Sequence, residues 1–318
     1  SFLLCEIFKS QDIDVGFLIG GVSNSFNRSA SLGSSDFFIV EADEYDSAFF
    51  DKRSKFIHYH PDTLIINNIE FDHADIFHDI SDILKQFHHV IRTVPENGNI
   101  LFHKEENNIL KLIDMGCWSK THKLGSSDNI KLSMEDNAIY FGNEKFDLNH
   151  LPMRGHHNLN NAVIAIYCAF LHGIQPKKSF EALKNSQGVK RRFEIVFQED
   201  SKTVIDDFAH HPTAISKTIQ AAIIHFPSQK ILAIIELGSN TMSQGHHGEK
   251  LYKSASEIEK VFWLNLSGKK NKEFEHTSIE SLVEDLRNCI DKFDVILIMS
   301  NKDSKKISEP VIELIKTK

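Results

Sequence analysis

Two clusters of acidic and amide side chains each follow a short apolar run. Residues 41–46 (EADEYD) follow the run at 37–40, and residues 67–75 (NNIEFDHAD) follow the run at 64–66. Continuous apolar runs predict strands of a parallel sheet that is covered on both faces. Ligands bind at the carboxyl ends of such strands, and carboxylates there can hold Mg²⁺ on nucleotide phosphates.

The first cluster alone is equally consistent with a solvated loop, because charged runs are usually exposed. A single histidine such as His73 is also more often a surface or capping residue. Two clusters at neighbouring strand ends favour a metal site, in which carboxylates such as Glu41 bind Mg²⁺ and His73 is a direct or outer-sphere ligand.

Two further groups could bind a nucleotide. Asn158 and Asn161 lie three residues apart at the start of a predicted helix, hence on one face, and amides can read the edge of a nucleobase. Asn158 could instead cap the helix, whereas Asn161 is harder to explain as a cap. Arg191 and Arg192 are adjacent in a chain where only seven of the 36 basic residues are Arg. Their planar guanidinium groups suit a phosphate or ribose contact, with an interdomain salt bridge as the alternative.

Other chemistries have weaker support in the sequence. His210 and His211 follow Asp206 and Asp207, but adjacent histidines on a turn diverge and no third ligand lies at the usual spacing, so we do not expect zinc. The sequence contains no GxSxG and no intact GxxxxGK[ST] phosphate loop. Magnesium-binding acids without a phosphate loop form an incomplete nucleotide site, and residues 1–8 read as an amphipathic helix without an initiator Met. We therefore expect that a preceding segment is missing.

The pattern of elements predicts two α/β domains, at residues 1–190 and 191–318. In the first, residues 97–151 predict a small, mostly antiparallel subsheet with strands near 100–102, 130–132 and 138–141, followed by helices at 158–172 and 177–187. In the second, strands alternate with helices and predict a largely parallel sheet. Its strands are expected at 203–207, 230–236, 261–265 and 294–300, and its helices at 213–225, 247–259, 278–291 and 307–316.

Composition narrows the class of protein. The 318 residues are 41% hydrophobic and 25% charged, which predicts a folded chain with a sizeable core. The net charge of -8 disfavours non-specific binding to nucleic acid or anionic membranes. Single cysteines at 5, 117, 168 and 289 favour a reducing, cytoplasmic setting. The longest apolar run is about half of what a bilayer crossing requires, so we expect no membrane span, and no protein partner is implied.

The ordered motifs resemble the Mur ligase family, and within it the branch that acts in peptidoglycan recycling. The matching segments are GFLIGGV, SDFFIVEADEYDSAFFDKRSKFIHY, LIINNIEFDHADIF, GHHNLNNA, RRFE, DDFAHHPTAI and ELGSNTM. The resemblance implies a central ATP-binding domain followed by a Rossmann-like C-terminal domain. It also implies an ATP- and Mg²⁺-dependent ligase that joins L-alanyl-γ-D-glutamyl-meso-diaminopimelate to UDP-N-acetylmuramate through an acyl phosphate.

The resemblance assigns roles to residues at the nucleotide. Glu41 would bind the Mg²⁺ shared with the ATP phosphates, and His73, after Asn68, would serve a second magnesium. The remaining nucleotide contacts would come from Asn158 and Asn161 on adenine, Arg192 on the nucleotide, and Asp207 on ribose or phosphate.

On the substrate side, His211 would lie near the closed active site, and a loop would help to hold the peptide, namely Ser239, Asn240, Thr241 and Met242. Many relatives carry Pro-Arg where this chain has Leu237 and Gly238, and a Gly-rich stretch where it has residues 302–306. The matching region offers His88 with Lys85 nearby, so we do not predict the carbamylated lysine of some relatives.

The resemblance also places the phosphate loop and a UDP-binding domain upstream of Ser1, so the chain alone is expected to be a poor catalyst. Two alternatives stay open. One is a UDP-N-acetylmuramate–L-alanine ligase, against which residues 43–56 (DEYDSAFFDKRSKF) argue. The other is a non-catalytic nucleotide- or metal-binding module that lacks the phosphate loop.

Overall fold

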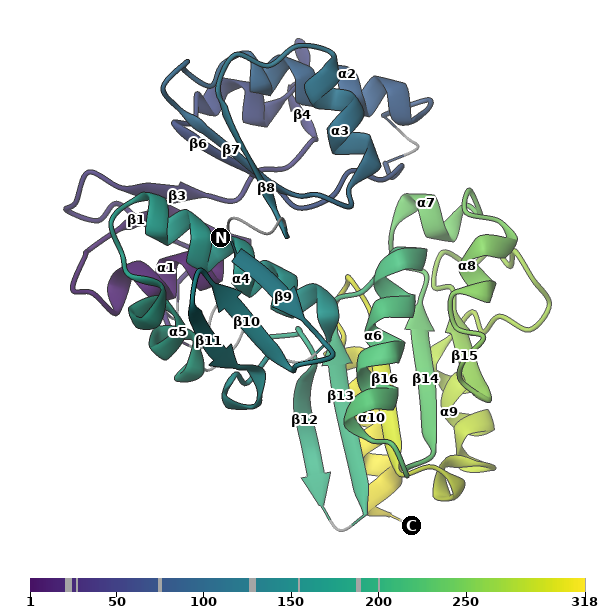
Figure 1. The fold of residues 1–318 in the computed structure, drawn as a ribbon. Coiled ribbons are helices and arrows are strands. Elements are labelled where there is room, and N and C mark those ends of the chain that lie inside the picture. Colours follow the sequence, from purple (N-terminus) through teal and green to yellow (C-terminus); the bar gives the residue numbers. More distant parts are fainter. Residues whose placement is uncertain are drawn as a thin grey trace. The chain divides into compact units, whose positions relative to one another are not determined.

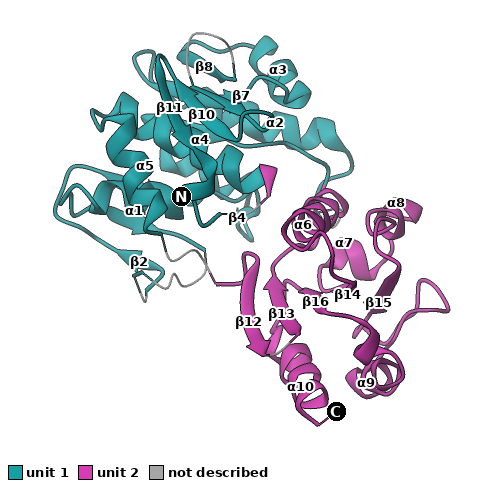
Figure 2. Ribbon diagram, turned by 60° about the horizontal axis from the view of Figure 1, so that its bottom comes forward, with its two compact units in different colours: residues 1–71, 76–153, 157–188 teal, residues 72–75, 154–156, 189–318 magenta. Residues whose placement is uncertain are grey.

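The computed structural model describes residues 1–20, 25–26, 28–73, 76–125, 130–153, 155–186, 190–199 and 201–317. The motif residues 21–22 and 74–75 lie outside this set. The chain forms two compact units (Figure 2), one of residues 1–71, 76–153 and 157–188 and the other of residues 72–75, 154–156 and 189–318.

The first unit contains short strands in four small sheets (Figure 1). Its strands are β1 (Gly16–Leu18), β2 (Ala30–Ser31), β3 (Phe38–Val40), β4 (Asp46–Ala48), β5 (Asp51–Ser54), β6 (Thr63–Ile66), β7 (Asn99–His103), β8 (Lys120–Leu124), β9 (Ile130–Ser133), β10 (Ala138–Phe141) and β11 (Glu144–Asp147). Its helices are α1 (Phe2–Lys9), η1 (Lys55–Tyr59), α2 (Ile80–Ile91), α3 (Asn107–Asp114), η2 (Leu148–His150), α4 (His156–Leu171) and α5 (Pro176–Lys184).

The strand that precedes Glu41 is part of a parallel pair, since β3 pairs with β1 in parallel. A second sheet consists of β6, β7 and β8, all parallel. The prediction that residues 100–102 belong to an antiparallel subsheet is therefore wrong, and the antiparallel sheet within the described part of residues 97–151 consists of β9, β10 and β11. The reason lies in burial: Ile100 and Phe102 pack on one face of β7 and Leu101 packs on the other, so the run is apolar at consecutive positions, as in a covered parallel sheet.

Helix α4 runs through the core of the first unit and begins before the predicted residue. Because it starts at His156, Asn158 lies inside its first turn and is not the N-cap, which corrects that interpretation. The predicted stop is confirmed, because Gly173 has φ 87° and donates its N–H to the Phe170 carbonyl at 3.0 Å.

The second unit is a single five-stranded sheet with helices on both faces. Its strands are β12 (Glu194–Glu199), β13 (Lys202–Asp207), β14 (Ile231–Glu236), β15 (Lys260–Leu264) and β16 (Val295–Met299). Its helices are α6 (Pro212–His225), α7 (Asn240–Ser243), α8 (Glu249–Lys253), α9 (Ile279–Arg287), η3 (Ile290–Lys292) and α10 (Lys305–Lys316).

The strand order of this sheet is β12-β13-β16-β14-β15, and every pair except the antiparallel β12–β13 is parallel. Helices α6, α7 and α8 pack on one face, whereas α9 and α10 pack on the other (Figure 1). The predicted parallel α/β architecture is confirmed. The helix predicted at 247–259 is shorter, since it spans only Glu249–Lys253 after Gly248 at φ 53°.

None of the helices in the described ranges is both long and apolar enough to cross a membrane.

Candidate functional site

Glu41 is the first residue after β3, and its carboxylate is exposed. Its backbone N–H donates to the Leu18 carbonyl at 2.7 Å, and its Oε2 accepts a hydrogen bond from Ser1 Oγ at 2.9 Å. A Cβ atom at Gly20 would lie 2.8 Å from Glu41 Oε1, so a side chain at position 20 would crowd this carboxylate. The carboxylate therefore lies open beside a glycine, where a cation can reach it.

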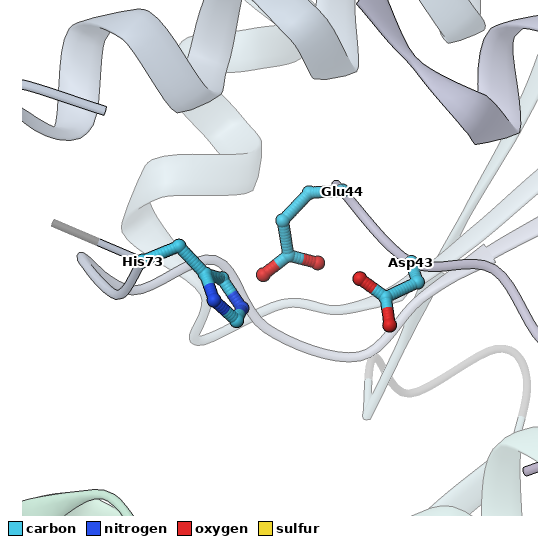
Figure 3. Close-up of side chains that lie close together, drawn as sticks. All are labelled: Asp43, Glu44 and His73. Atoms are coloured by element: carbon cyan, nitrogen blue, oxygen red, sulfur yellow. The ribbon is translucent and has the colours of Figure 1, made fainter. Parts of the chain in front are cut away.

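Three further side chains bring possible metal ligands together. One ligand atom each of Asp43, Glu44 and His73 lies within 4.8 Å of the other two (Figure 3). Two carboxylates and one imidazole supply few enough ligands for Mg²⁺ to keep water or phosphate oxygens, as it prefers. The sequence named the acids of this cluster, but it assigned Glu41 rather than Asp43 and Glu44 to the metal. Asn68, which follows β6 and precedes His73 in the sequence, is exposed. Its Nδ2 donates a hydrogen bond to Glu70 Oε1 at 3.3 Å.

The two amides expected at adenine lie on the first turns of α4. Asn158 and Asn161 are both half-buried, and the residues between and after them, Leu159 and Ala162, are buried in the core. Residues three apart on a helix lie on one face, so the two amides can act together on a flat ring. Their contact with a nucleobase stays a prediction.

The adjacent arginines of the second unit differ in their contacts. Arg191 Nη2 donates to the Ser300 carbonyl at 2.5 Å, and Arg191 Nε lies 3.4 Å from Asp206 Oδ2. Arg192 is exposed, and its guanidinium lies 5.4 Å from the centroid of the Phe208 ring. Arg191 therefore has an internal structural role, while Arg192 is the arginine that a ligand can reach.

Asp207 is buried at the end of β13 with 5% of its surface exposed. Its Oδ2 accepts from the Phe193 N–H at 2.8 Å, and its Oδ1 accepts from the Ala209 N–H at 2.8 Å and from Thr218 Oγ1 at 3.2 Å. Burial raises the pKa of this carboxyl, although the hydrogen bonds oppose the shift. The ribose or phosphate contact of Asp207 stays a prediction.

His211 begins α6 and lies against a histidine from a distant segment. As N-cap it accepts the Thr213 N–H on Nδ1 at 3.3 Å. Its ring centroid is 4.9 Å from that of His247, in an edge-to-face arrangement. Sequence reasoning missed His247, because the only local signal was its neighbour His246. The adjacent His210 instead donates from Nδ1 to the Phe208 carbonyl at 2.8 Å.

The environment of His247 predicts a pH-dependent stability. Burial, followed by the nearby charge of His211, lowers the pKa of His247 to about 4, with Lys250 and His246 acting in the same direction and Asp72 opposing them. Between pH 4 and about 6.5 the unfolded chain thus binds a proton that the folded chain does not, so stability falls as pH drops through this window. Replacing His247 by Gln should reduce that loss by about 1–2 kcal/mol, a value discounted for partial exposure.

Urea unfolding of the wild type and of His247→Gln at pH 7 and pH 4.5 measures this difference. His246→Gln is the matched control at the exposed neighbouring ring. An identical pH dependence in wild type and His247→Gln would contradict the assignment.

A cavity of about 380 Å³ opens where β14 and β16 of the second sheet end. Its lining residues are Glu236, Leu237, Gly238, Asn240, Ser243, Leu266, Ser267, Lys302, Asp303, Lys306 and Ile307. Of the residues expected to hold a peptide, Asn240 lines this cavity. Ser239 caps α7 by accepting the Met242 N–H at 3.2 Å, and Thr241 is buried, so these two shape the loop.

The loop after β16 is fixed against this cavity. Ser300 Oγ donates to the buried Glu236 carboxylate and accepts the Lys302 N–H at 2.9 Å. A Cβ atom at Gly238 would lie 2.2 Å from Asn301 Oδ1 and 2.9 Å from Lys302 Cγ. The departures from the family pattern at 238 and at 302–306 are therefore coupled, because the side chain of Asn301 and the stem of Lys302 together occupy the space that a side chain at 238 would need.

The chain matches two known protein families and is similar to named bacterial ligases. Residues 21–169 match the Mur ligase middle domain family, and residues 191–304 match the family described as the Mur ligase, glutamate ligase domain. A Haemophilus influenzae protein named UDP-N-acetylmuramate–L-alanyl-γ-D-glutamyl-meso-2,6-diaminoheptandioate ligase is 37% identical over 99% of the chain and 74% of its own length. An Escherichia coli protein of the same name is 42% identical over 78% of the chain and 56% of its own length.

The fold of this chain is similar to that of a solved ligase structure. The murein peptide ligase of Psychrobacter arcticus superposes with a TM-score of 0.73 at 32% identity, over 98% of this chain and 74% of that one. The chain therefore spans between about half and three quarters of the length of these relatives.

Proposed function

The chain belongs to the Mur ligase family, as its ordered motifs predict, and on that premise we propose that it carries the ATP-dependent part of a ligase joining L-alanyl-γ-D-glutamyl-meso-diaminopimelate to UDP-N-acetylmuramate. The observation that carries this proposal is the similarity, over 99% of the chain, to a relative named for that reaction. In the proposed reaction the sugar carboxylate attacks the γ-phosphorus of ATP and releases ADP. The peptide amine then attacks the acyl carbon, loses a proton and displaces phosphate.

Groups that could bind ATP follow strands β3 and β6 and lie on the first turns of α4. Glu41 and His73, with Asp43 and Glu44 beside His73, would hold Mg²⁺, which neutralises charge on the phosphates. The half-buried amides of α4 would take the adenine. Because catalysis of phosphoryl transfer consists mostly of positioning and charge stabilisation, the exposed carboxylate and amide groups suit this role.

The second unit offers a cavity for the peptide. It carries two lysines, Lys302 and Lys306, and two acids, Glu236 and Asp303, so its formal charges balance. Such a site favours a group that carries both an ammonium and a carboxylate over a phosphate dianion. The free end of diaminopimelate is such a group, and the buried apolar side chain of Ile307 suits its methylene chain.

The proposed substrates indicate where in the cell the enzyme acts. Because UDP-sugars and ATP are metabolites of the cytoplasm, we propose that the enzyme is cytoplasmic. The reaction requires no protein partner.

The test is an assay of the full-length gene product with UDP-N-acetylmuramate, the tripeptide, ATP and Mg²⁺. Mass spectrometry should detect the amide product, and phosphate should appear in equal amount and only when all components are present. Nucleotide binding without product would instead support the non-catalytic module.

A further inference from the structure

Two residues beside Arg192 adopt a backbone conformation that is unusual for residues with side chains. Arg191 has φ 61° and Phe193 has φ 56°. Left-handed φ values crowd the Cβ atom against the backbone, so such residues persist only where the surroundings hold them. Arg192 therefore lies between two strained residues, and the contacts that hold them determine where its side chain points.

Asp207 supplies one of these contacts. Its Oδ2 accepts the Phe193 N–H at 2.8 Å, while its Oδ1 is engaged by the Ala209 N–H and by Thr218 Oγ1. The carboxylate thus links the segment before β12, the turn after β13 and helix α6. With 5% of its surface exposed, it has little surface left for a ligand.

The other contacts hold Arg191 and leave Arg192 accessible. The Arg191 N–H donates to Glu194 Oε2 at 2.7 Å, and its guanidinium is bound to the Ser300 carbonyl. Both arginines lie over the Phe208 ring, with guanidinium carbons 5.1 and 5.4 Å from its centroid. Within the described ranges, Arg192 forms no ion pair or hydrogen bond, so its guanidinium rests on the Phe208 ring, and its positive charge acts on Asp207 by lowering the pKa of that carboxyl.

We propose that Asp207 is a positioning residue: its carboxylate holds the left-handed backbone at Phe193, which presents Arg192 to the nucleotide, and it does not bind the nucleotide itself. This inference rests on the proposed function for the target of Arg192. It replaces the direct ribose or phosphate contact that the sequence pattern assigns to Asp207.

A double-mutant cycle between positions 207 and 192 tests the inference. In the full-length protein, Asp207→Asn and Arg192→Ala should each weaken Mg-ATP binding about tenfold, as loss of one charged contact does. The double variant should bind no more weakly than Arg192→Ala alone, because Asp207 acts through Arg192. Additive losses would show that Asp207 contacts the nucleotide directly and would overturn the inference. In kinetics, the KM for ATP should rise while that for the peptide stays unchanged.

A structural measurement separates this inference from the proposed function. The three-bond HN–Hα coupling of Phe193 reports its φ, which Asp207→Asn should move out of the left-handed region whether or not the protein is a ligase. An unchanged φ would overturn the inference. If Arg192→Ala leaves ATP binding intact while φ changes, the nucleotide role of Arg192 fails and the positioning of the backbone stands.

A second pair of variants covers the case in which Asp207→Asn does not fold. Proline at 193 removes the N–H and cannot adopt φ 56°, so Phe193→Pro should weaken ATP binding as Asp207→Asn does. Phe193→Ala is the matched control, because it removes the ring but keeps the N–H donor. Equal ATP affinities for Phe193→Pro and Phe193→Ala would contradict the inference.

Discussion

Replacing Glu41 by glutamine should lower kcat for tripeptide ligation by about a hundredfold or more, which corresponds to roughly 3 kcal/mol of transition-state stabilisation. Glutamine keeps the shape of the side chain but removes the negative charge that Mg²⁺ needs. The side chain is exposed after β3 and lies against Gly20, so the substitution should not disturb packing. Steady-state kinetics over a range of Mg²⁺ concentrations measures the effect.

The matched control is Glu144→Gln on β11, which is also exposed. It should retain wild-type kcat and Mg²⁺ dependence. Glu44→Gln is an informative companion, because Glu44 is grouped with Asp43 and His73 as possible ligands. Wild-type Mg²⁺ dependence in Glu41→Gln together with a strong effect in Glu44→Gln would move the metal from Glu41 to that group.

Replacing Lys302 and Lys306 together by methionine should raise the KM for the tripeptide about a hundredfold, since two charged contacts of roughly 1.5 kcal/mol each would be lost. Both lysines line the cavity at the end of the second sheet, and in the described part of the chain neither forms an ion pair. Methionine retains a long unbranched stem, so the cavity should keep its shape. The KM for ATP should be unchanged.

The control is Lys305→Met, which lies next to Lys306 on α10 and does not line the cavity. It should leave the tripeptide KM within about twofold of wild type, as surface substitutions usually do. An unchanged tripeptide KM in the double variant would remove the peptide from this cavity. An equal rise in the KM for ATP would instead indicate a nucleotide site there.

Much of the fold follows from patterns that are local in the sequence. The apolar runs of β13, β14, β15 and β16 are continuous because helices cover both faces of their sheet, and that pattern is visible without a structure. The assignment of residues 100–102 was wrong because a short apolar run does not reveal which strand is its neighbour. Pairing of β7 with β6 and β8 is a tertiary property.

The candidate site can be proposed from the sequence where its residues follow strands, and not where it depends on contacts between distant segments. The metal roles of Glu41 and His73 were predicted because acids and a histidine follow apolar runs, and the structure brings His73 close to Asp43 and Glu44. The edge-to-face contact of His211 with His247 joins segments that no spacing rule connects. Likewise, the stem of Lys302 lies in the space beside Gly238. The departures from the family pattern at 238 and at 302–306 looked independent in the sequence, but the residues at these positions are neighbours in the fold.

The central claim is that this chain serves a ligase for the murein tripeptide and not for L-alanine. The most direct measurement is a competition in which the full-length gene product, with UDP-N-acetylmuramate and Mg-ATP, receives both acceptors at equal concentration. We predict that kcat/KM for the tripeptide exceeds that for L-alanine by at least about a hundredfold, since L-alanine lacks the diaminopimelate end that we propose the cavity holds. Preference for L-alanine would contradict the account and identify the UDP-N-acetylmuramate–L-alanine ligase reaction instead.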